Sequence, residues 1–120
     1  MKQIIIPALL LATNANAGLI EDYTRHVAAH YGFDGITIIK AGIPRLHKAC
    51  GDSQNYACTN TANRKVMLNV ALESQPSMLL DVMCHEGGHL AQLRDGSPQS
   101  EQDANDRALL CVEDFLGGKL

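Results

Sequence analysis

The stretch Cys84-His85-Glu86-Gly87-Gly88-His89 lies in the middle of an apolar segment that runs from Met78 to Leu93. Residues four apart lie on the same face of a helix, one turn apart, so His85 and His89 can direct their imidazoles toward one point. The apolar residues on either side leave this helix almost no polar face, which predicts that it is buried. A polar cluster within a buried helix needs a partner.

A metal ion is the partner that this pattern favours. Two histidines four residues apart, with a glutamate after the first, form the helical half of a zinc hydrolase site. The carboxylate of Glu86 can reach a water on the metal without occupying the metal itself. Gly87 and Gly88 each cost about 1 kcal/mol relative to alanine in a helix interior, which predicts that another element approaches closely. The alternative is an exposed helix with two surface histidines.

A third ligand is expected from the last segment of the chain. On a wheel of about 100° per residue, Glu101 falls in the middle of an apolar face and Asp103 points away from it. The other residues within about 80° of Glu101 are mostly apolar: Ala104, Asn105, Ala108, Leu109, Cys111, Val112, Phe115 and Leu116. A buried carboxylate needs a partner, so Glu101 is predicted to join His85 and His89 at the metal.

Three local signals set the expected ends of these helices. The first helix is expected to start at Gln75-Pro76-Ser77, with Ser77 as its N-cap, and to end at Gly96. Ser97-Pro98 or Ser100 can cap the second helix, and Ser100 with Asp103 fits a capping box. The two helices are therefore predicted to form an antiparallel hairpin.

The residues His85-Glu86-x-x-His89 followed by Glu101-x-x-Ala104-Asn105 resemble the gluzincin group of metallopeptidases. The resemblance implies a minimal zincin-like domain with one Zn²⁺ per chain, bound by His85, His89 and Glu101. It implies that Glu86 is the catalytic general base and that Asn105 orients a ligand through a hydrogen bond. Only eleven residues separate His89 from Glu101, which is short for this group and requires a tight hairpin.

The same resemblance implies a function. The chain is expected to be a small exported zinc-dependent metallopeptidase that hydrolyses peptide bonds in a peptide or protein substrate. No histidine or tyrosine follows Glu101, so a residue that stabilises the oxyanion would have to come from upstream, with Arg45, His47 and Tyr56 as candidates. The alternatives are a non-catalytic zinc-binding domain and a disulfide-stapled protein-interaction module.

The N-terminus has the pattern of a secretory signal peptide. Lys2 precedes an apolar run from Ile4 to Ala12, and Ala15-Asn16-Ala17 is followed by Gly18. The apolar run is shorter than the roughly 20 residues that span a bilayer. Residues 1–17 are therefore expected to be removed, and residues 18–120 to form a single secreted or periplasmic domain. The alternative is that the N-terminal segment is a buried helix or strand.

Composition argues against two classes of partner. Without Lys2 the chain has nine basic and thirteen acidic residues, which gives a formal charge of −4, and the sequence contains no basic cluster. Nucleic acid is therefore not expected as a partner. The segment after residue 17 contains neither an apolar run long enough to span a membrane nor a basic amphipathic helix, so no membrane association is expected either.

Four cysteines in an exported domain of about 100 residues predict two disulfides, for which three pairings exist. Cys50 and Cys58 flank a short polar loop and are expected to pair across it. Cys84 then pairs with Cys111 and joins the two helices of the hairpin. The alternative, in which the cysteines bind metal, is disfavoured because no Cys-x-x-Cys pair exists.

The remaining segments predict an α+β fold. Residues 19–31 have helical periodicity, and the second histidine pair, His26 and His30, is assigned to a solvated helix face. Residues 36–40 favour a strand, and residues 41–63 are expected to be irregular. Residues 65–72 favour a second strand. The resemblance to zinc peptidases implies that this strand borders the cleft and pairs with an extended substrate.

Overall fold

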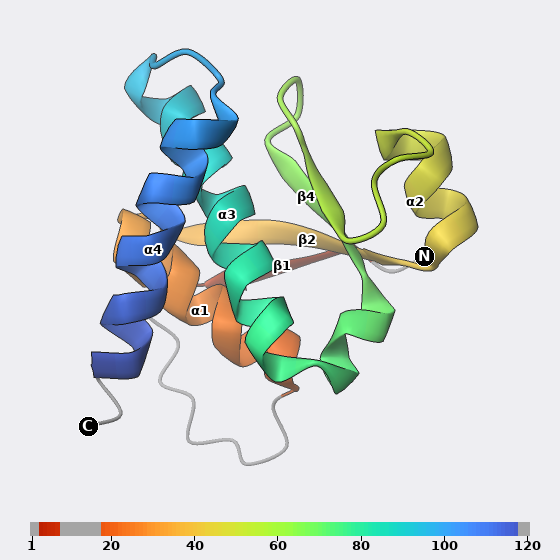
Figure 1. Cartoon of the computed structure of the whole chain (residues 1–120), viewed down its shortest axis with the longest axis horizontal. Coiled ribbons are helices and arrows are strands. Elements are labelled where there is room, and N and C mark those ends of the chain that lie inside the picture. Colours follow the sequence, from red (N-terminus) through yellow and green to blue (C-terminus); the bar gives the residue numbers. More distant parts are fainter. Residues whose placement is uncertain (1–2, 8–17, 118–120) are drawn as a thin grey trace.

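The computed structural model describes residues 3–7 and 18–117, and this part of the chain has an α+β fold (Figure 1). Its elements are, in chain order, β1 (Gln3–Pro7), α1 (Leu19–Tyr31), β2 (Gly35–Ala41), α2 (Ile43–Cys50), β3 (Ala57–Asn60), β4 (Lys65–Asn69), the 3₁₀ helix η1 (Val70–Ser74), α3 (Pro76–Asp95) and α4 (Glu101–Gly117). The predicted class, the N-terminal helix and the C-terminal helix pair are confirmed.

The sheet is mixed, with the strand order β1-β2-β4-β3. β2 runs parallel to β4 and pairs Ile38 with Val66, whereas β1 and β3 are antiparallel to their neighbours. Burial alternates along the first half of β2, where Ile36 and Ile38 are buried and Gly35, Thr37 and Ile39 are half-buried. This period of two is expected for a strand with one face toward the core.

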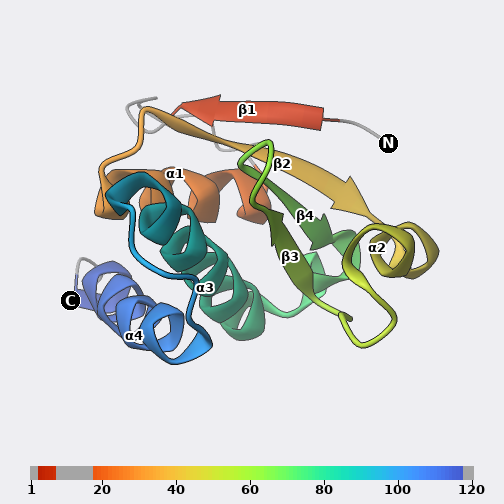
Figure 2. The same cartoon turned by 90° about the horizontal axis from the view of Figure 1, so that it is seen from above.

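Helices α1 and α3 cover that face of the sheet, and α4 lies on the outer side of α3 (Figure 2). The core joins α1, the inner face of the sheet and α3. Its fully buried large side chains include Ile20, Val27, Ile38, Leu68, Leu72 and Leu79. α3 is therefore packed between the sheet and α4, and its central turns are buried, as the apolar segment predicted.

The two glycines of the motif allow these close contacts. A Cβ atom at Gly87 would lie 2.5 Å from Cγ1 of Val27 and 2.8 Å from Cε2 of Tyr31, both on α1. A Cβ atom at Gly88 would lie 3.2 Å from the carbonyl oxygen of Ala104 on α4. The expected close approach is confirmed, and it involves a helix on each side of α3.

Two expectations for the middle of the chain are wrong. Residues 41–63 are not irregular, because they form α2 and β3. Pro44 is the second residue of α2, a position that tolerates proline because its missing N–H would have no helical partner. The strand predicted at 65–72 ends at Asn69, whose side chain accepts a hydrogen bond from the Ala71 N–H and starts η1.

The ends of α3 agree with the prediction in part. The helix begins at Pro76 with Gln75 as N-cap, so the assignment of Ser77 as the cap is wrong. Proline favours the first helical position because its φ angle already suits a helix. At the other end Gly96 has φ 71°, the left-handed conformation that glycine adopts most readily, and it is the C-cap that we predicted.

Both disulfides have the pairing that the sequence favoured. Cys50–Cys58 links the end of α2 to β3, and Cys84–Cys111 links α3 to α4. Disulfides persist in oxidising environments, so this pair is consistent with an extracellular location.

The structure describes only part of the predicted signal peptide. Of residues 1–17 the structure describes Gln3–Pro7, which form the edge strand β1 and bury Ile6. Residues 8–17 lie outside the described residues, and the expected cleavage site is among them, so cleavage stays a prediction. In the described part of the chain no helix is both long and apolar enough to cross a membrane.

Candidate metal centre

Three side chains from two helices converge beside the middle of α3. Nε2 of His89 lies 3.2 Å from Nε2 of His85, as the four-residue spacing predicted. Glu101 is the first residue of α4, and its two carboxylate oxygens lie 2.9 Å from His85 Nε2 and 3.1 Å from His89 Nε2. The tight hairpin therefore brings together the three residues that the sequence singled out.

The donor atoms fit a small divalent metal. Zinc ligands at 2.0–2.1 Å in a tetrahedron lie roughly 3.3–3.4 Å from one another. The observed separations of 2.9–3.2 Å are slightly shorter, and small side-chain rotations would open them. Two imidazoles and one carboxylate are also a donor set of catalytic zinc sites, in which a fourth position stays open. His85, His89 and Glu101 thus form a possible metal site.

The position of Glu101 corrects the wheel prediction. Its side chain is 75% exposed and does not lie in the middle of the buried face. The buried residues of α4 are Ala104, Ala108 and Cys111, whose centre lies about 50° from Glu101 on the wheel. This face is rotated because α4 packs on α1 as well as on α3. The case for a metal therefore rests on the convergence with the histidines, because an exposed carboxylate is solvated without one.

Asp103 also differs from the prediction that it points away. Its carboxylate accepts hydrogen bonds from Gln92 Nε2 at 2.8 Å and from Arg107 Nε at 2.8 Å. Both hydrogen bonds lower the pKa of Asp103 below its ordinary value. Asp103 therefore holds the start of α4 against α3, and its carboxylate is separate from the His85–His89–Glu101 cluster.

Glu86 lies against the cluster and is buried, with 7% of the residue exposed. Its Oε1 accepts a hydrogen bond of 2.8 Å from the hydroxyl of Thr59 on β3. Burial raises the pKa of Glu86 above its ordinary value, and the Thr59 hydrogen bond and the nearby histidines act in the opposite direction. A buried carboxylate with a raised pKa beside a possible metal site is a candidate for acid–base chemistry.

Two polar residues at the site were missed by sequence reasoning. Thr59 lies in the segment that we expected to be irregular, so nothing placed its hydroxyl beside Glu86. Gln92 is fully buried, and its Oε1 lies 3.0 Å from His89 Nδ1. Its spacing of three residues from His89 put it on the same helix face, and this was the one available signal. Asn105, the predicted orienting residue, is exposed and makes no hydrogen bond to a ligand within the described residues.

An open cleft of about 740 Å³ leads to the cluster. Its walls are β3, α3, the connection before α4 and the first turns of α4. The strand at its border is β3, whereas β4, the predicted one, lies behind β3 in the sheet. Of the three upstream candidates for oxyanion stabilisation, Tyr56 lines the cleft, and Arg45 and His47 are not among its lining residues. The lining residues include three carboxylates, those of Asp81, Glu86 and Glu101, and no lysine or arginine.

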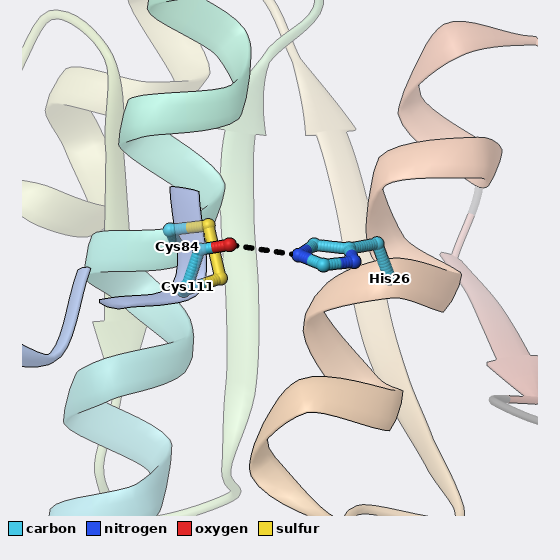
Figure 3. A group of neighbouring side chains, drawn as sticks. All are labelled: His26, Cys84 and Cys111. Atoms are coloured by element: carbon cyan, nitrogen blue, oxygen red, sulfur yellow. Dashed lines mark hydrogen bonds between the residues drawn. A yellow bond between two sulfur atoms is a disulfide. The ribbon is translucent and has the colours of Figure 1, made fainter. Parts of the chain in front are cut away.

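The second histidine pair does not form the solvated face that we predicted. His26 Nε2 donates a 2.8 Å hydrogen bond to the Cys111 carbonyl (Figure 3). His30 Nδ1 lies 2.9 Å from an Asp114 carboxylate oxygen. His26 also lies close to the sulfurs of Cys84 and Cys111, a grouping that could hold a metal by proximity alone. These sulfurs are bonded to each other, and the thiolate is the form that binds metal. The pair therefore joins α1 to α4.

Comparison of the chain with protein-family models, curated proteins and solved structures found no match in any of the three.

Proposed function

We propose that the chain is a small exported zinc metallopeptidase. One observation carries the proposal: the Nε2 atoms of His85 and His89 and the carboxylate of Glu101 lie within 3.2 Å of one another, beside a buried glutamate in an open cleft. Metal ligands alone would suit a structural site. A structural zinc site is closed by four protein ligands, however, and the described residues supply three together with solvent access.

The residues have distinct roles in this proposal. His85, His89 and Glu101 would bind Zn²⁺, which supplies a Lewis acid that polarises the scissile carbonyl and stabilises negative charge on its oxygen. Glu86 takes a proton from the attacking water and later donates it to the leaving amine. Thr59 holds the carboxylate of Glu86 in position through its hydrogen bond.

The sheet edge provides a means of binding the substrate. Among the described strands β3 pairs with β4 alone, so its other edge is unpaired and borders the cleft. An extended peptide can add to such an edge through main-chain hydrogen bonds, which places its carbonyl groups near the adjacent helix. β3 has four residues, which suits recognition of a short peptide segment. The two disulfides support the exported location.

Metal content is the first test. The purified protein should contain about one zinc per chain by mass spectrometry of metals. Glu101→Ala should lower the occupancy, and Asp106→Ala on the same helix should retain it, because the exposed Asp106 carboxylate contacts Gln102 and lies outside the cluster. If zinc-reconstituted protein with intact disulfides binds no metal, the proposal is wrong.

Turnover is the second test, because it separates an enzyme from a non-catalytic zinc domain. Glu86→Gln should retain zinc and lower the hydrolysis of a fluorogenic peptide library by roughly 10²–10⁴-fold, the usual contribution of a general base. Zinc-loaded wild type and Glu86→Gln with equally negligible turnover would instead support the non-catalytic alternative.

A further inference from the structure

We propose that Gln92 is a positioning residue that fixes the metal-binding tautomer of His89 and anchors the helix turn that carries Glu101. The proposal rests on the metal site described above, but not on the reaction assigned to it. Gln92 is fully buried on α3, one turn after His89, and each polar atom of its side chain has a partner. A single amide thus contacts both ligand-bearing helices.

The hydrogen bonds fix the orientation of the Gln92 amide. Its Nε2 lies 2.9 Å from the carbonyl oxygen of Ser100 and 2.8 Å from a carboxylate oxygen of Asp103. Both of these atoms can only accept, so the NH₂ group must face them. The flipped amide would place Oε1 against two other oxygens in a buried site. Oε1 therefore faces the Nδ1 atom of His89 at 3.0 Å, and the Ser100 N–H at 3.4 Å.

The tautomer of His89 follows from this orientation. A carbonyl oxygen can only accept, so Nδ1 of His89 must carry a hydrogen and donate it to Gln92. In the neutral imidazole the other nitrogen, Nε2, then has a free lone pair. That lone pair faces His85 and Glu101, the direction from which a metal would bind. The Glu101 carboxylate, 3.1 Å from Nε2, also accepts and competes for the hydrogen, but Glu101 is 75% exposed and can be solvated by water, whereas the buried Gln92 oxygen cannot. The opposite tautomer would leave the Gln92 oxygen and the Nδ1 lone pair facing each other without a hydrogen.

The other end of the amide anchors the start of α4. Ser100 precedes Glu101, and its hydroxyl accepts a hydrogen bond of 3.2 Å from the Asp103 N–H. This is one of the two hydrogen bonds of the predicted capping box; the Ser100 N–H donates to Gln92 and not to the Asp103 side chain. Gln92 binds the main chain of Ser100 and the side chain of Asp103, the two residues on either side of this first turn. Arg107 joins the same network through Asp103 and Asp95. The position of the exposed Glu101 side chain is thus set by partly buried hydrogen bonds at the start of α4.

A purely structural role for Gln92 makes a different prediction. If the role were purely structural, replacing Gln92 would lower the stability of the protein and leave the zinc affinity of the folded molecules unchanged. A positioning role requires a lower zinc affinity in folded molecules and a changed protonation pattern at His89. Residues that orient metal ligands in this manner usually contribute 10–100-fold to metal affinity.

The first experiment is ¹⁵N NMR of the His89 ring in the metal-free wild type, at a pH at which the imidazole is neutral. The two ring nitrogens have distinct shifts when one of them carries the hydrogen. We expect Nδ1–H as the dominant form, and a dominant Nε2–H form would overturn the proposal. This measurement needs neither bound zinc nor activity, so it remains informative if the proposed function fails.

The second experiment compares zinc affinity, measured by competition with a chelator, in wild type and variants that retain a native circular dichroism spectrum. Gln92→Met fills a similar volume without hydrogen bonds and should bind zinc 10–100-fold more weakly, with mixed His89 tautomers. If Gln92→Met does not fold, the tautomer of His89 measured in the metal-free wild type still decides the proposal. Asp106→Asn is the matched control, because it removes an exposed carboxylate of the same helix that contacts Gln102 and is not part of the Gln92 network. It should bind zinc within about threefold of wild type, and folded Gln92→Met with unchanged affinity would overturn the proposal.

Discussion

The hydroxyl of Thr59 on β3 donates a 2.8 Å hydrogen bond to Oε1 of Glu86 on α3. This hydrogen bond crosses from the edge strand to the helix and meets a carboxylate that is buried beside two histidines. It favours the ionised form of Glu86, whereas burial, the larger effect, raises the pKa of the group. The relationship connects the packing of the sheet to the protonation of the proposed base.

Replacement of Thr59 should therefore change the pH dependence of peptide hydrolysis. In Thr59→Val the pKa of Glu86 rises further, so more of the base is protonated at a given pH and the acidic limb of kcat/KM moves to higher pH. A hydrogen bond to a charged group contributes roughly 1.5–3 kcal/mol, so we expect a loss of about tenfold or more on this limb. Thr59→Ser keeps the hydroxyl and should restore the wild-type profile. An unchanged profile in Thr59→Val would show that the hydrogen bond does not act on the base.

Gly87→Ala should destabilise the protein although alanine is the better helix former. The added Cβ would lie 2.5 Å from Val27 Cγ1 and 2.8 Å from the Tyr31 ring. Overpacking costs about 1–3 kcal/mol, which is offset by at most about 1 kcal/mol of helix propensity. Urea denaturation measures the difference. Val27→Ala removes one of the two clashing groups, so the double variant should lose less than the sum of the single variants. Simple additivity would contradict the contact.

The two disulfides should contribute unequally to stability. Cys84–Cys111 closes a loop of 27 residues in sequence separation, and Cys50–Cys58 closes one of 8. The chain-entropy model gives about 3.5 kcal/mol for the longer loop and about 2.5 kcal/mol for the shorter one. We expect the variant in which Cys84 and Cys111 are both alanine to have a lower urea midpoint than the variant in which Cys50 and Cys58 are both alanine. Equal midpoints for the two double variants would contradict the prediction that the longer loop contributes more to stability.

Tyr31 should make the protein sensitive to alkaline pH. Burial raises the pKa of Tyr31 to about 12, from an ordinary value of 10.0. The hydroxyl donates a 2.9 Å hydrogen bond to the Cys84 carbonyl, which the phenolate form cannot make. Because the folded-state pKa is the higher one, the stabilisation is complete below pH 10 and is lost as the pH rises toward 12.

Phenolate absorbance measures this titration directly. The difference between wild type and Tyr31→Phe isolates one of three tyrosines. We expect its midpoint near pH 12, and Tyr31→Phe should be less stable by about 1 kcal/mol at neutral pH. It should also lose less stability than wild type above pH 10. A midpoint near 10 in the difference titration would be inconsistent with a buried hydroxyl at this position.

The contribution of β1 can be tested with two neighbouring isoleucines. Ile6 is 4% exposed and Ile5 is 69% exposed on the same strand. In the full-length chain Ile6→Ala should lower the free energy of unfolding by about 2–5 kcal/mol, and Ile5→Ala should change it little. A chain that begins at Gly18 should lose at least about 1.5–3 kcal/mol, the value of one buried isoleucine. If both alanine variants match the wild type, β1 contributes nothing to the stability of the sheet.

The sequence alone determined what depends on a single helix or on residue chemistry. The meeting of His85 and His89 follows from the 3.6-residue turn, and the end of α3 follows from the conformational freedom of Gly96. The glycine pair predicted a close approach because its cost within a helix needed a reason. These inferences held because each involves neighbours along the chain and needs no knowledge of distant segments.

The tertiary structure decided everything that depends on how these elements pack. A wheel placed Glu101 at the centre of the buried face of α4, but contact with α1 as well as α3 rotated that face toward Ala104 and Cys111. Thr59 reaches Glu86 because β3 forms the edge strand beside α3, and Gln92 reaches Ser100 because the helix hairpin folds back on itself. Such contacts join residues 8 to 27 positions apart, and the side-chain pattern of either segment alone does not define them. The two histidines of the candidate site are thus brought together locally, whereas Glu101, Thr59 and Gln92 are placed beside them by the fold.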